Sequence, residues 1–118
     1  AKKSGSNELL VWGTGRATRE FLYVKDAARA VVDAAEKYNS TEPVNIGTGA
    51  EVSIRELVER IRELTGFTGA LKWDHSKPDG QPRRCLDTSR ARNAFGFEAK
   101  VQLEDGLRET IDWYLSQN

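Results

Sequence analysis

Residues 12–26 read W-G-T-G-R-A-T-R-E-F-L-Y-V-K-D, and the elements predicted on either side support this stretch. Gly13 and Gly15 stand between Trp12 and Arg19, so a flexible loop can fold back and bring an indole and a guanidinium to one ligand. An indole stacks on a base and a guanidinium donates two hydrogen bonds to a pyrophosphate, which predicts a nucleoside diphosphate site. The alternative, which composition alone favours, is that Trp12 fills the core and Arg19 is a solvated strand-edge charge.

Composition bounds the size and class of the protein. Its 118 residues are enough for one small domain. Lys plus Arg and Asp plus Glu number 18 each, so no net charge recruits nucleic acid or a membrane surface as a partner. The sequence has no apolar run of membrane-spanning length and residues 1–7 lack the apolar core of a signal peptide, so the cytoplasm is the expected location. A single cysteine, Cys85, and a single histidine, His75, argue against a metal site and an internal disulfide.

The segments around the opening stretch alternate between strands and a helix. Leu9–Trp12 and Phe21–Val24 are predicted strands, with a loop over residues 13–18 between them. Asp26 is predicted to cap a helix that runs to about Tyr38. One face of this helix carries mostly small side chains, which favours close packing against a sheet: Ala27, Ala30, Val31, Ala34 and Tyr38.

The second half of the chain is predicted to add one strongly signalled helix and several short elements. Val44–Ile46 is a predicted third strand that ends at a glycine turn. Ser53 and Glu56 form a capping box that starts a helix, and Gly66 is the expected C-cap at the end of that helix. The apolar stripe of this helix consists of Ile54, Leu57, Val58, Ile61 and Leu64. The remaining predictions are a strand at Leu71–Trp73, a helix from Thr88 to about Phe95 capped by Asp87, and a final helix from about Leu103 to Leu115.

This order of elements predicts the fold class. Two of the crossovers have the length of βα units, so residues 1–118 are predicted to form a single mixed α/β (α+β) domain of short strands and about four helices. Residues 1–8 are expected to be loose or a truncated start. The strands are too few and too short to close a sheet of ordinary size, so we expect a piece of a larger protein.

Two glycine pairs are compatible with a dinucleotide site at first sight, but neither completes the fingerprint. After Gly13 and Gly15 the third glycine position holds Thr18, and after Gly47 and Gly49 it holds Val52. Neither pair stands between a strand and an immediately following helix. The chain also has no Tyr-x-x-x-Lys. The sequence therefore predicts neither a cofactor-binding residue nor a catalytic residue in this chain.

The segment 77–84, K-P-D-G-Q-P-R-R, is the second candidate for a site. Lys77, Arg83 and Arg84 place three cations in a loop whose backbone entropy is reduced by two prolines. A solvated basic surface loop is the alternative. The segment gains weight as part of a binding site because a second arginine-bearing loop ends at Arg19.

Three motifs, in this order and spacing, carry a resemblance to a known family. They are residues 11–26, V-W-G-T-G-R-A-T-R-E-F-L-Y-V-K-D, residues 43–57, P-V-N-I-G-T-G-A-E-V-S-I-R-E-L, and residues 77–91, K-P-D-G-Q-P-R-R-C-L-D-T-S-R-A. Together they resemble the C-terminal part of the NAD(P)-dependent sugar-nucleotide epimerase/dehydratases of the extended short-chain dehydrogenase/reductase family. The resemblance runs from Leu9 onward and lies nearest to the GDP-L-fucose synthase branch.

The resemblance implies a two-part enzyme that converts GDP-4-keto-6-deoxy-D-mannose to GDP-L-fucose. An N-terminal Rossmann domain would bind NADP and carry the catalytic residues, whereas the C-terminal part grips the GDP-sugar. The residues implied to contact the nucleotide are Trp12, Arg19 and Arg84, of which Arg84 stands where many members have lysine. Ala70 stands where a basic residue is frequent, which bears on the choice of GDP-sugar.

Two hypotheses remain open from the sequence. The chain is either the substrate-binding part of a reductase-epimerase, or a free-standing nucleotide-sugar binding or interaction module without chemistry. The expected partners are a GDP-sugar, the missing Rossmann domain and a second copy in a homodimer. We expect the 118-residue chain alone to be inactive as an oxidoreductase.

Overall fold

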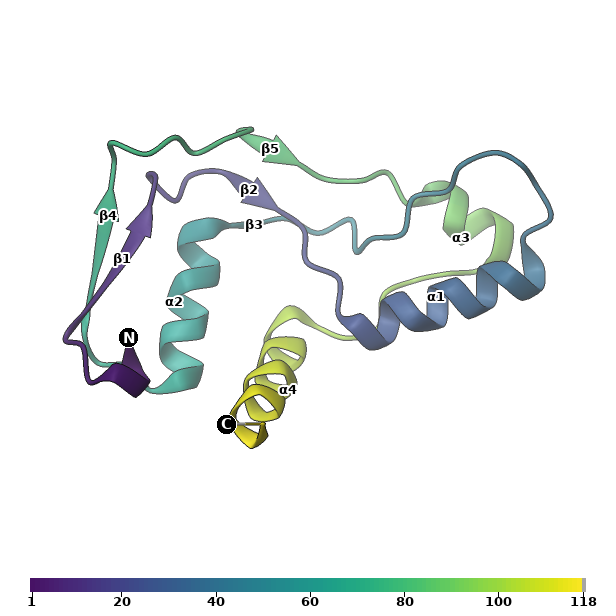
Figure 1. Cartoon of the computed structure of the whole chain (residues 1–118). Coiled ribbons are helices and arrows are strands. Elements are labelled where there is room, and N and C mark those ends of the chain that lie inside the picture. Colours follow the sequence, from purple (N-terminus) through teal and green to yellow (C-terminus); the bar gives the residue numbers. More distant parts are fainter. Residues whose placement is uncertain (118) are drawn as a thin grey trace.

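The computed structural model describes residues 1–117, which form short strands and four α-helices in two connected halves (Figure 1). The predicted mixed α/β class is confirmed. In chain order the elements are the 3₁₀-helix η1 (Lys2–Ser4), β1 (Glu8–Trp12), β2 (Thr18–Arg19), α1 (Val24–Lys37), β3 (Val52–Ser53), α2 (Ile54–Thr65), β4 (Ala70–Asp74), β5 (Arg83–Arg84), α3 (Ser89–Phe95) and α4 (Leu103–Ser116). Within residues 1–117 no helix has the length and apolar character that crossing a membrane requires.

Two small sheets organise the first half of the molecule. β1 pairs with β4 in parallel, in a register that places Trp12 opposite Asp74. A second sheet has the order β3-β2-β5, with β2 antiparallel to β3 and parallel to β5. The predicted strands at the β1 and β4 positions are confirmed, each one or two residues longer than the sequence indicates. The pairing brings the opening stretch and the basic loop side by side along the top of Figure 1.

Helix α2 forms as its sequence signals predict. The Ser53 hydroxyl oxygen accepts a hydrogen bond from the backbone N–H of Glu56, and the Glu56 carboxylate accepts one from the Ser53 N–H. Gly66 ends the helix in the left-handed conformation at φ +61°, which a glycine adopts without strain. Val58 and Ile61 line one hollow with Leu9 of β1, and α2 also contacts α4. This helix therefore supports the sheet whose end carries Trp12.

The second half has an aromatic core between α1 and α3. Ala30, Ala91, Phe95 and Phe97 are buried together, and the Tyr38 ring meets the Phe95 ring edge to face at 5.8 Å between centroids. Ala30, Ala34 and Tyr38 of the predicted small-residue face are thus covered by α3 and its aromatic core, whereas Val31 is exposed, and the sequence expectation of a sheet partner is wrong. Alanines on both helices allow this close approach, which sequence periodicity cannot distinguish from packing on a sheet.

Three local predictions are corrected. Phe21–Val24 is not a strand, because residues 20–23 are irregular and α1 already starts at Val24. Val44–Ile46 is irregular and forms no ladder with any of residues 1–117, although the Val44 and Ile46 side chains pack on the Phe95 core. Asp26 lies in the first turn of α1 instead of capping it. The N-cap is Tyr23, which makes no side-chain cap hydrogen bond.

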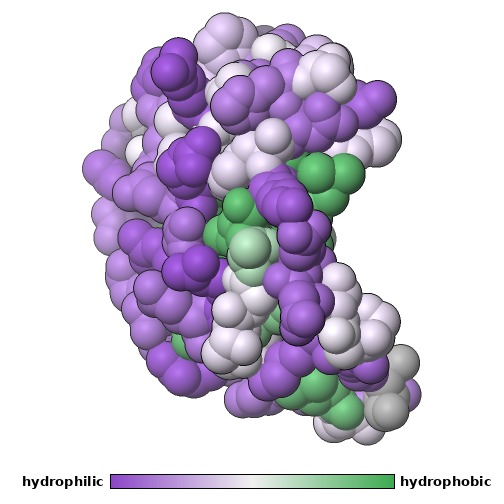
Figure 2. All heavy atoms as spheres, turned by 90° about the vertical axis from the view of Figure 1, so that its left-hand side faces the viewer, coloured by the Kyte–Doolittle hydropathy of each residue, from purple (hydrophilic) through white to green (hydrophobic). Residues whose placement is uncertain are grey.

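The molecule is elongated for its length. Its radius of gyration is 17.1 Å, whereas a compact domain of this size has about 13.5 Å. Its accessible surface is 8225 Å², against about 6,400 Å² for a folded monomer of the same mass. Hydrophobic residues gather on the hollowed side of the molecule (Figure 2). The large apolar residues left exposed include Val24, Val31 and Val32 of α1 and Trp113, Tyr114 and Leu115 of α4.

Candidate functional site

Arg19 and Arg84 lie side by side on neighbouring strands. β2 and β5 pair in parallel with Arg19 opposite Arg84, so two residues 65 positions apart in sequence share one face of a sheet. Both line a cleft of about 360 Å³ together with Glu20, Phe21, Leu22, Ile46, Gly47 and Leu86. Among residues 1–117 neither guanidinium has an acidic partner within ion-pair distance, and Arg19 donates only to the carbonyl oxygen of Thr18. The cleft therefore presents two adjacent positive charges.

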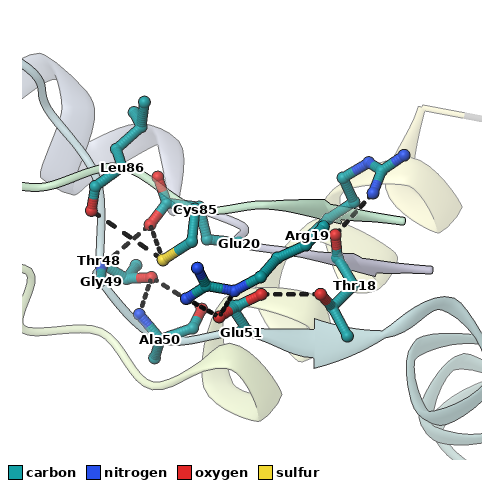
Figure 3. A network of polar contacts seen from close by, with 10 residues as sticks. Thr18, Arg19, Glu20, Thr48, Gly49, Ala50, Glu51, Cys85 and Leu86 are labelled. Carbon is teal, nitrogen blue, oxygen red and sulfur yellow. Dashed lines mark hydrogen bonds and ion pairs between the residues drawn. The ribbon is translucent and has the colours of Figure 1, made fainter. Parts of the chain in front are cut away.

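The opposite face of the same sheet holds a closed polar cluster. Successive strand side chains point to opposite faces, so Thr18 and Arg83 lie across the sheet from the arginine pair. Glu51 joins them, because its carboxylate accepts from the Thr18 hydroxyl at 2.7 Å and from Arg83 Nε at 2.8 Å. The Arg83 guanidinium and the Thr18 hydroxyl hold the pKa of Glu51 below its usual value. Figure 3 shows the Arg19 side chain directed away from this cluster.

Trp12 and Lys77 form the other end of the candidate site. Trp12 is the last residue of β1 and is 69% exposed, so it does not fill the core as the alternative from sequence would require. Lys77 Nζ lies 5.6 Å from the centroid of the indole ring, within the range of a cation–π contact. The register of β1 and β4 explains the meeting, because Lys77 starts the basic loop just after Asp74, the strand partner of Trp12.

The basic loop (residues 77–84) lies beside the glycine loop (residues 13–18) along its length. At one end the Gly13 N–H donates to the Asp74 carbonyl oxygen at 2.9 Å, and at the other the Thr18 N–H donates to the Pro82 carbonyl oxygen at 2.9 Å. Between them Gly80 approaches Arg19, since a Cβ on Gly80 would lie 3.7 Å from Arg19 Nη2. The structure thus brings Trp12 to Lys77 and Arg19 to Arg84 along one pair of loops, while Arg83 lies on the other face.

Two acidic residues at the site are absent from the sequence predictions. Glu20 lines the cleft, and its carboxylate accepts a hydrogen bond from the Gly49 N–H at 2.9 Å, which holds the glycine turn at the cleft edge. Glu51 neutralises Arg83. Their partners lie 29 and 32 positions away in the sequence, so local sequence patterns could not have revealed them. Burial and the nearby Glu20 carboxylate raise the pKa of the Cys85 thiol, which agrees with an ordinary free thiol instead of an activated thiolate.

Comparison with known proteins identifies the family. Residues 1–110 match the family model described as GDP-mannose 4,6 dehydratase. The chain belongs to this family. GDP-L-fucose synthase 1 of Arabidopsis thaliana is 51% identical over 98% of the chain, and GDP-L-fucose synthase of Escherichia coli K12 is 37% identical over 98%. The chain covers 35% and 38% of these two proteins, so it spans about a third of the length of the curated relatives.

Solved structures agree with this assignment. A GDP-L-fucose synthetase from Naegleria fowleri bound to NADP has a TM-score of 0.91 and 29% identity, over 98% of this chain and 36% of that one. A UDP-glucose 4-epimerase from Thermotoga maritima with UDP-glucose has a TM-score of 0.85 and 32% identity, over 93% of this chain and 35% of that one. The family resemblance predicted from the three sequence motifs is therefore confirmed.

Proposed function

We propose that this chain is the C-terminal, substrate-gripping part of an NADP-dependent epimerase-reductase that converts GDP-4-keto-6-deoxy-D-mannose to GDP-L-fucose. The observation that carries the proposal is the unpaired Arg19 and Arg84 couple at the cleft. Like charges placed opposite each other on neighbouring strands are destabilising unless an anion lies between them. A diphosphate supplies that anion, and the identity to GDP-L-fucose synthases supports guanosine diphosphate as its source.

In this proposal the site has a base end and a diphosphate end. The exposed Trp12 ring offers a flat surface on which guanine stacks, with Lys77 at its face. Arg19 and Arg84 donate hydrogen bonds to the diphosphate oxygens, in the bidentate geometry that guanidinium favours. Arg83 contributes its positive charge to the loop, while its hydrogen bonds hold Glu51 and the sheet.

The cofactor belongs to another part of the enzyme. The residues of this chain do not fit NADP, because the Gly13–Gly15 turn leads into β2 and the Gly47–Gly49 turn leads into β3, not directly into a helix N-terminus. We infer that a Rossmann domain in the remainder of the protein binds NADP and supplies the catalytic residues. This chain binds and orients the GDP-sugar, and alone it transfers no hydride.

The exposed apolar residues support a missing partner domain. Val31 and Val32 on the outer face of α1 are 67% and 57% exposed, although the inner face of the same helix is buried. In a complete enzyme the Rossmann domain would cover this face. Without that cover, apolar surface of this extent drives self-association, so a homodimer of the isolated chain would differ from any dimer of the complete enzyme. Sedimentation at several concentrations tests this, and a strict monomer would favour a free-standing module.

The test of the function uses calorimetry and a coupled assay. Guanosine diphosphate should bind the chain weakly, and replacement of Arg19 or Arg84 by alanine should abolish that binding. Arg108→Ala is the matched control, because Arg108 pairs within α4 with Glu104. An enzyme of full length that contains this chain should oxidise NADPH in the presence of the 4-keto-6-deoxy GDP-sugar, and the chain alone should not. NADPH oxidation by the chain alone would refute the proposed division of roles.

A further inference from the structure

Asp79, at the middle of the basic loop, reaches across to the glycine loop. Its Oδ1 accepts a hydrogen bond from the Thr14 N–H at 2.6 Å, and its Oδ2 accepts one from the Thr14 hydroxyl at 2.5 Å. These bonds join residues 65 positions apart. No other acid lies between Asp74 and Asp87 in the sequence, so the basic loop has one carboxylate of its own and directs it at the neighbouring loop.

The glycine loop is shaped to receive this carboxylate. A Cβ on Gly13 would overlap Asp79 Oδ1, so any larger residue at position 13 would displace the Asp79 carboxylate from its bonds to Thr14. Gly13 also has φ +83°, a left-handed conformation that favours glycine. Gly15 is equally constrained, because a Cβ there would overlap the Trp73 ring. Close contact and hydrogen bonding therefore act together at Asp79.

Asp79 also divides the site at its middle. Trp12 and Lys77 lie on one side of the Thr14–Asp79 contact, and Arg19 and Arg84 lie on the other. The Thr14 hydroxyl and backbone N–H hold the pKa of Asp79 below its usual value, with a further contribution from the Gly15 N–H. The carboxylate is thus ionised at neutral pH and its acceptor atoms are engaged away from the arginine pair.

We propose that Asp79 is a positioning residue, which clamps the basic loop onto the glycine loop and so fixes the separation between the base-stacking end and the diphosphate end of the site. For the ligand this rests on the proposed function. Two loops that are already held at the bound spacing lose less conformational entropy when the nucleotide binds. Asp79 touches no substrate in this arrangement and acts through Trp12, Lys77, Arg19 and Arg84.

The first test needs no ligand. Asp79→Ala should speed hydrogen exchange of the Thr14 and Gly15 backbone amides at least 10-fold, while amides in the β1–β4 ladder keep their protection. Asp74→Ala is the matched control, since within the described residues 1–117 the Asp74 carboxylate accepts hydrogen bonds only from Ser76 in its own turn. Equal exchange at Thr14 in wild type and Asp79→Ala would overturn the clamp.

The second test measures the effect on binding. Asp79→Ala and Thr14→Val should each weaken guanosine diphosphate binding about 10-fold by calorimetry, and Thr14→Ser, which keeps the hydroxyl, should restore it. In an enzyme of full length the same changes should raise KM and leave kcat unchanged, because the ground state and the transition state share the nucleotide contacts. Loosened amides with unchanged affinity would overturn the positioning role alone. A wild-type protein that does not bind guanosine diphosphate would refute the proposed function and the positioning role with it, while the exchange data would still report the clamp.

Discussion

Asp26 and the Arg19–Arg84 pair are charged side chains in two different settings. The Asp26 carboxylate is buried and hydrogen-bonded, whereas the two arginines line an open cleft. The Asp26 side chain is 4% exposed, and its carboxylate accepts from the N–H groups of Lys100 and Val101 at 2.8 Å each and from Arg29 at 2.7 Å. The arginine pair has no acid partner within residues 1–117 and faces an open cleft. The Asp26 carboxylate therefore has its hydrogen-bond donors within the chain, whereas Arg19 and Arg84 have no acidic partner among the described residues.

The difference separates folding from binding. Burial raises the pKa of Asp26, but the hydrogen bonds from Val101, Arg29 and Lys100 outweigh it and bring the pKa below its usual value. Asp26 thereby ties α1 to the segment that enters α4, which contributes to stability. The Arg19–Arg84 pair makes no such stabilising ion pair within residues 1–117, and in the proposed function a diphosphate accounts for its placement. Mutations should therefore affect stability in one region and ligand affinity in the other.

The largest effect is expected at Asp26. Asp26→Ala leaves two backbone N–H groups without their acceptor and removes one acceptor of the Arg29 guanidinium, which still donates to the Glu98 carbonyl oxygen. This should lower the free energy of unfolding by about 3–5 kcal/mol. Urea denaturation followed by circular dichroism measures it. Asp33→Ala is the control, because Asp33 lies on the same helix and its ion pairs among residues 1–117 are with the partly exposed Arg29 and the exposed Lys37. A loss as large for Asp33→Ala as for Asp26→Ala would remove the contrast between the two regions.

The reverse behaviour is expected at the arginine pair. Arg19→Ala should weaken substrate binding by about 2–4 kcal/mol, roughly 30- to 700-fold, because one partner of a desolvated charged contact is lost. The unfolding midpoint should stay constant or rise slightly, since among residues 1–117 the Arg19 side chain donates only to the neighbouring Thr18 carbonyl oxygen, and its removal relieves the like-charge repulsion with Arg84. Calorimetry with guanosine diphosphate and thermal unfolding of the same samples separate the two quantities. A destabilised variant with intact affinity would assign Arg19 to folding.

Elements whose signals are local were predictable from sequence. The capping box at Ser53 and Glu56 and the C-cap at Gly66 are encoded within three or four residues, so α2 is placed correctly. The strand predicted at Phe21–Val24 is wrong, because aromatic and β-branched residues indicate burial as much as they indicate a strand. The strand predicted at Val44–Ile46 is wrong for a different reason. A ladder needs a partner strand, and local sequence says nothing about one.

The residues of the candidate site could be proposed from the sequence, but their arrangement could not. The resemblance pointed to Trp12, Arg19 and Arg84 and the basic loop added Lys77 and Arg83, yet sequence alone could not assign Arg83 and Arg84 to opposite faces. That distinction depends on the β2–β5 register, in which Thr18 lies opposite Arg83 and Arg19 opposite Arg84. Glu51 and Asp79 were missed because their partners lie 32 and 65 positions away. Which charge is neutralised is decided by such long-range contacts.

A smaller effect is expected from pH. The folded pKa of Asp26 lies below its unfolded value of about 3.9, so the unfolded chain binds more protons as the pH falls. The contribution of Asp26 is fully present above the unfolded pKa and is lost as the pH falls through the folded pKa. Stability should therefore decrease from about pH 5 downward, with a shallower decrease in Asp26→Asn. Urea titrations at several pH values measure the slope, and identical slopes in the two proteins would contradict the assignment.

The smallest effect is expected at Arg83, which tests the comparison within a single sheet. The Arg83 side chain is 72% exposed, so water and salt screen its ion pair with Glu51, and exposed pairs contribute little to stability. Arg83→Ala should lower the melting temperature only slightly, and Glu51→Gln should have a similarly small effect, because it removes the ion pair while its amide oxygen can still accept from the Thr18 hydroxyl. Affinity for guanosine diphosphate should fall far less than in Arg84→Ala, although the two arginines are adjacent in sequence, because Arg83 faces away from the cleft. Equal losses of affinity in Arg83→Ala and Arg84→Ala would mean that affinity depends on the total charge of the loop and not on the position of each arginine. The two faces of the sheet would then have no separate roles.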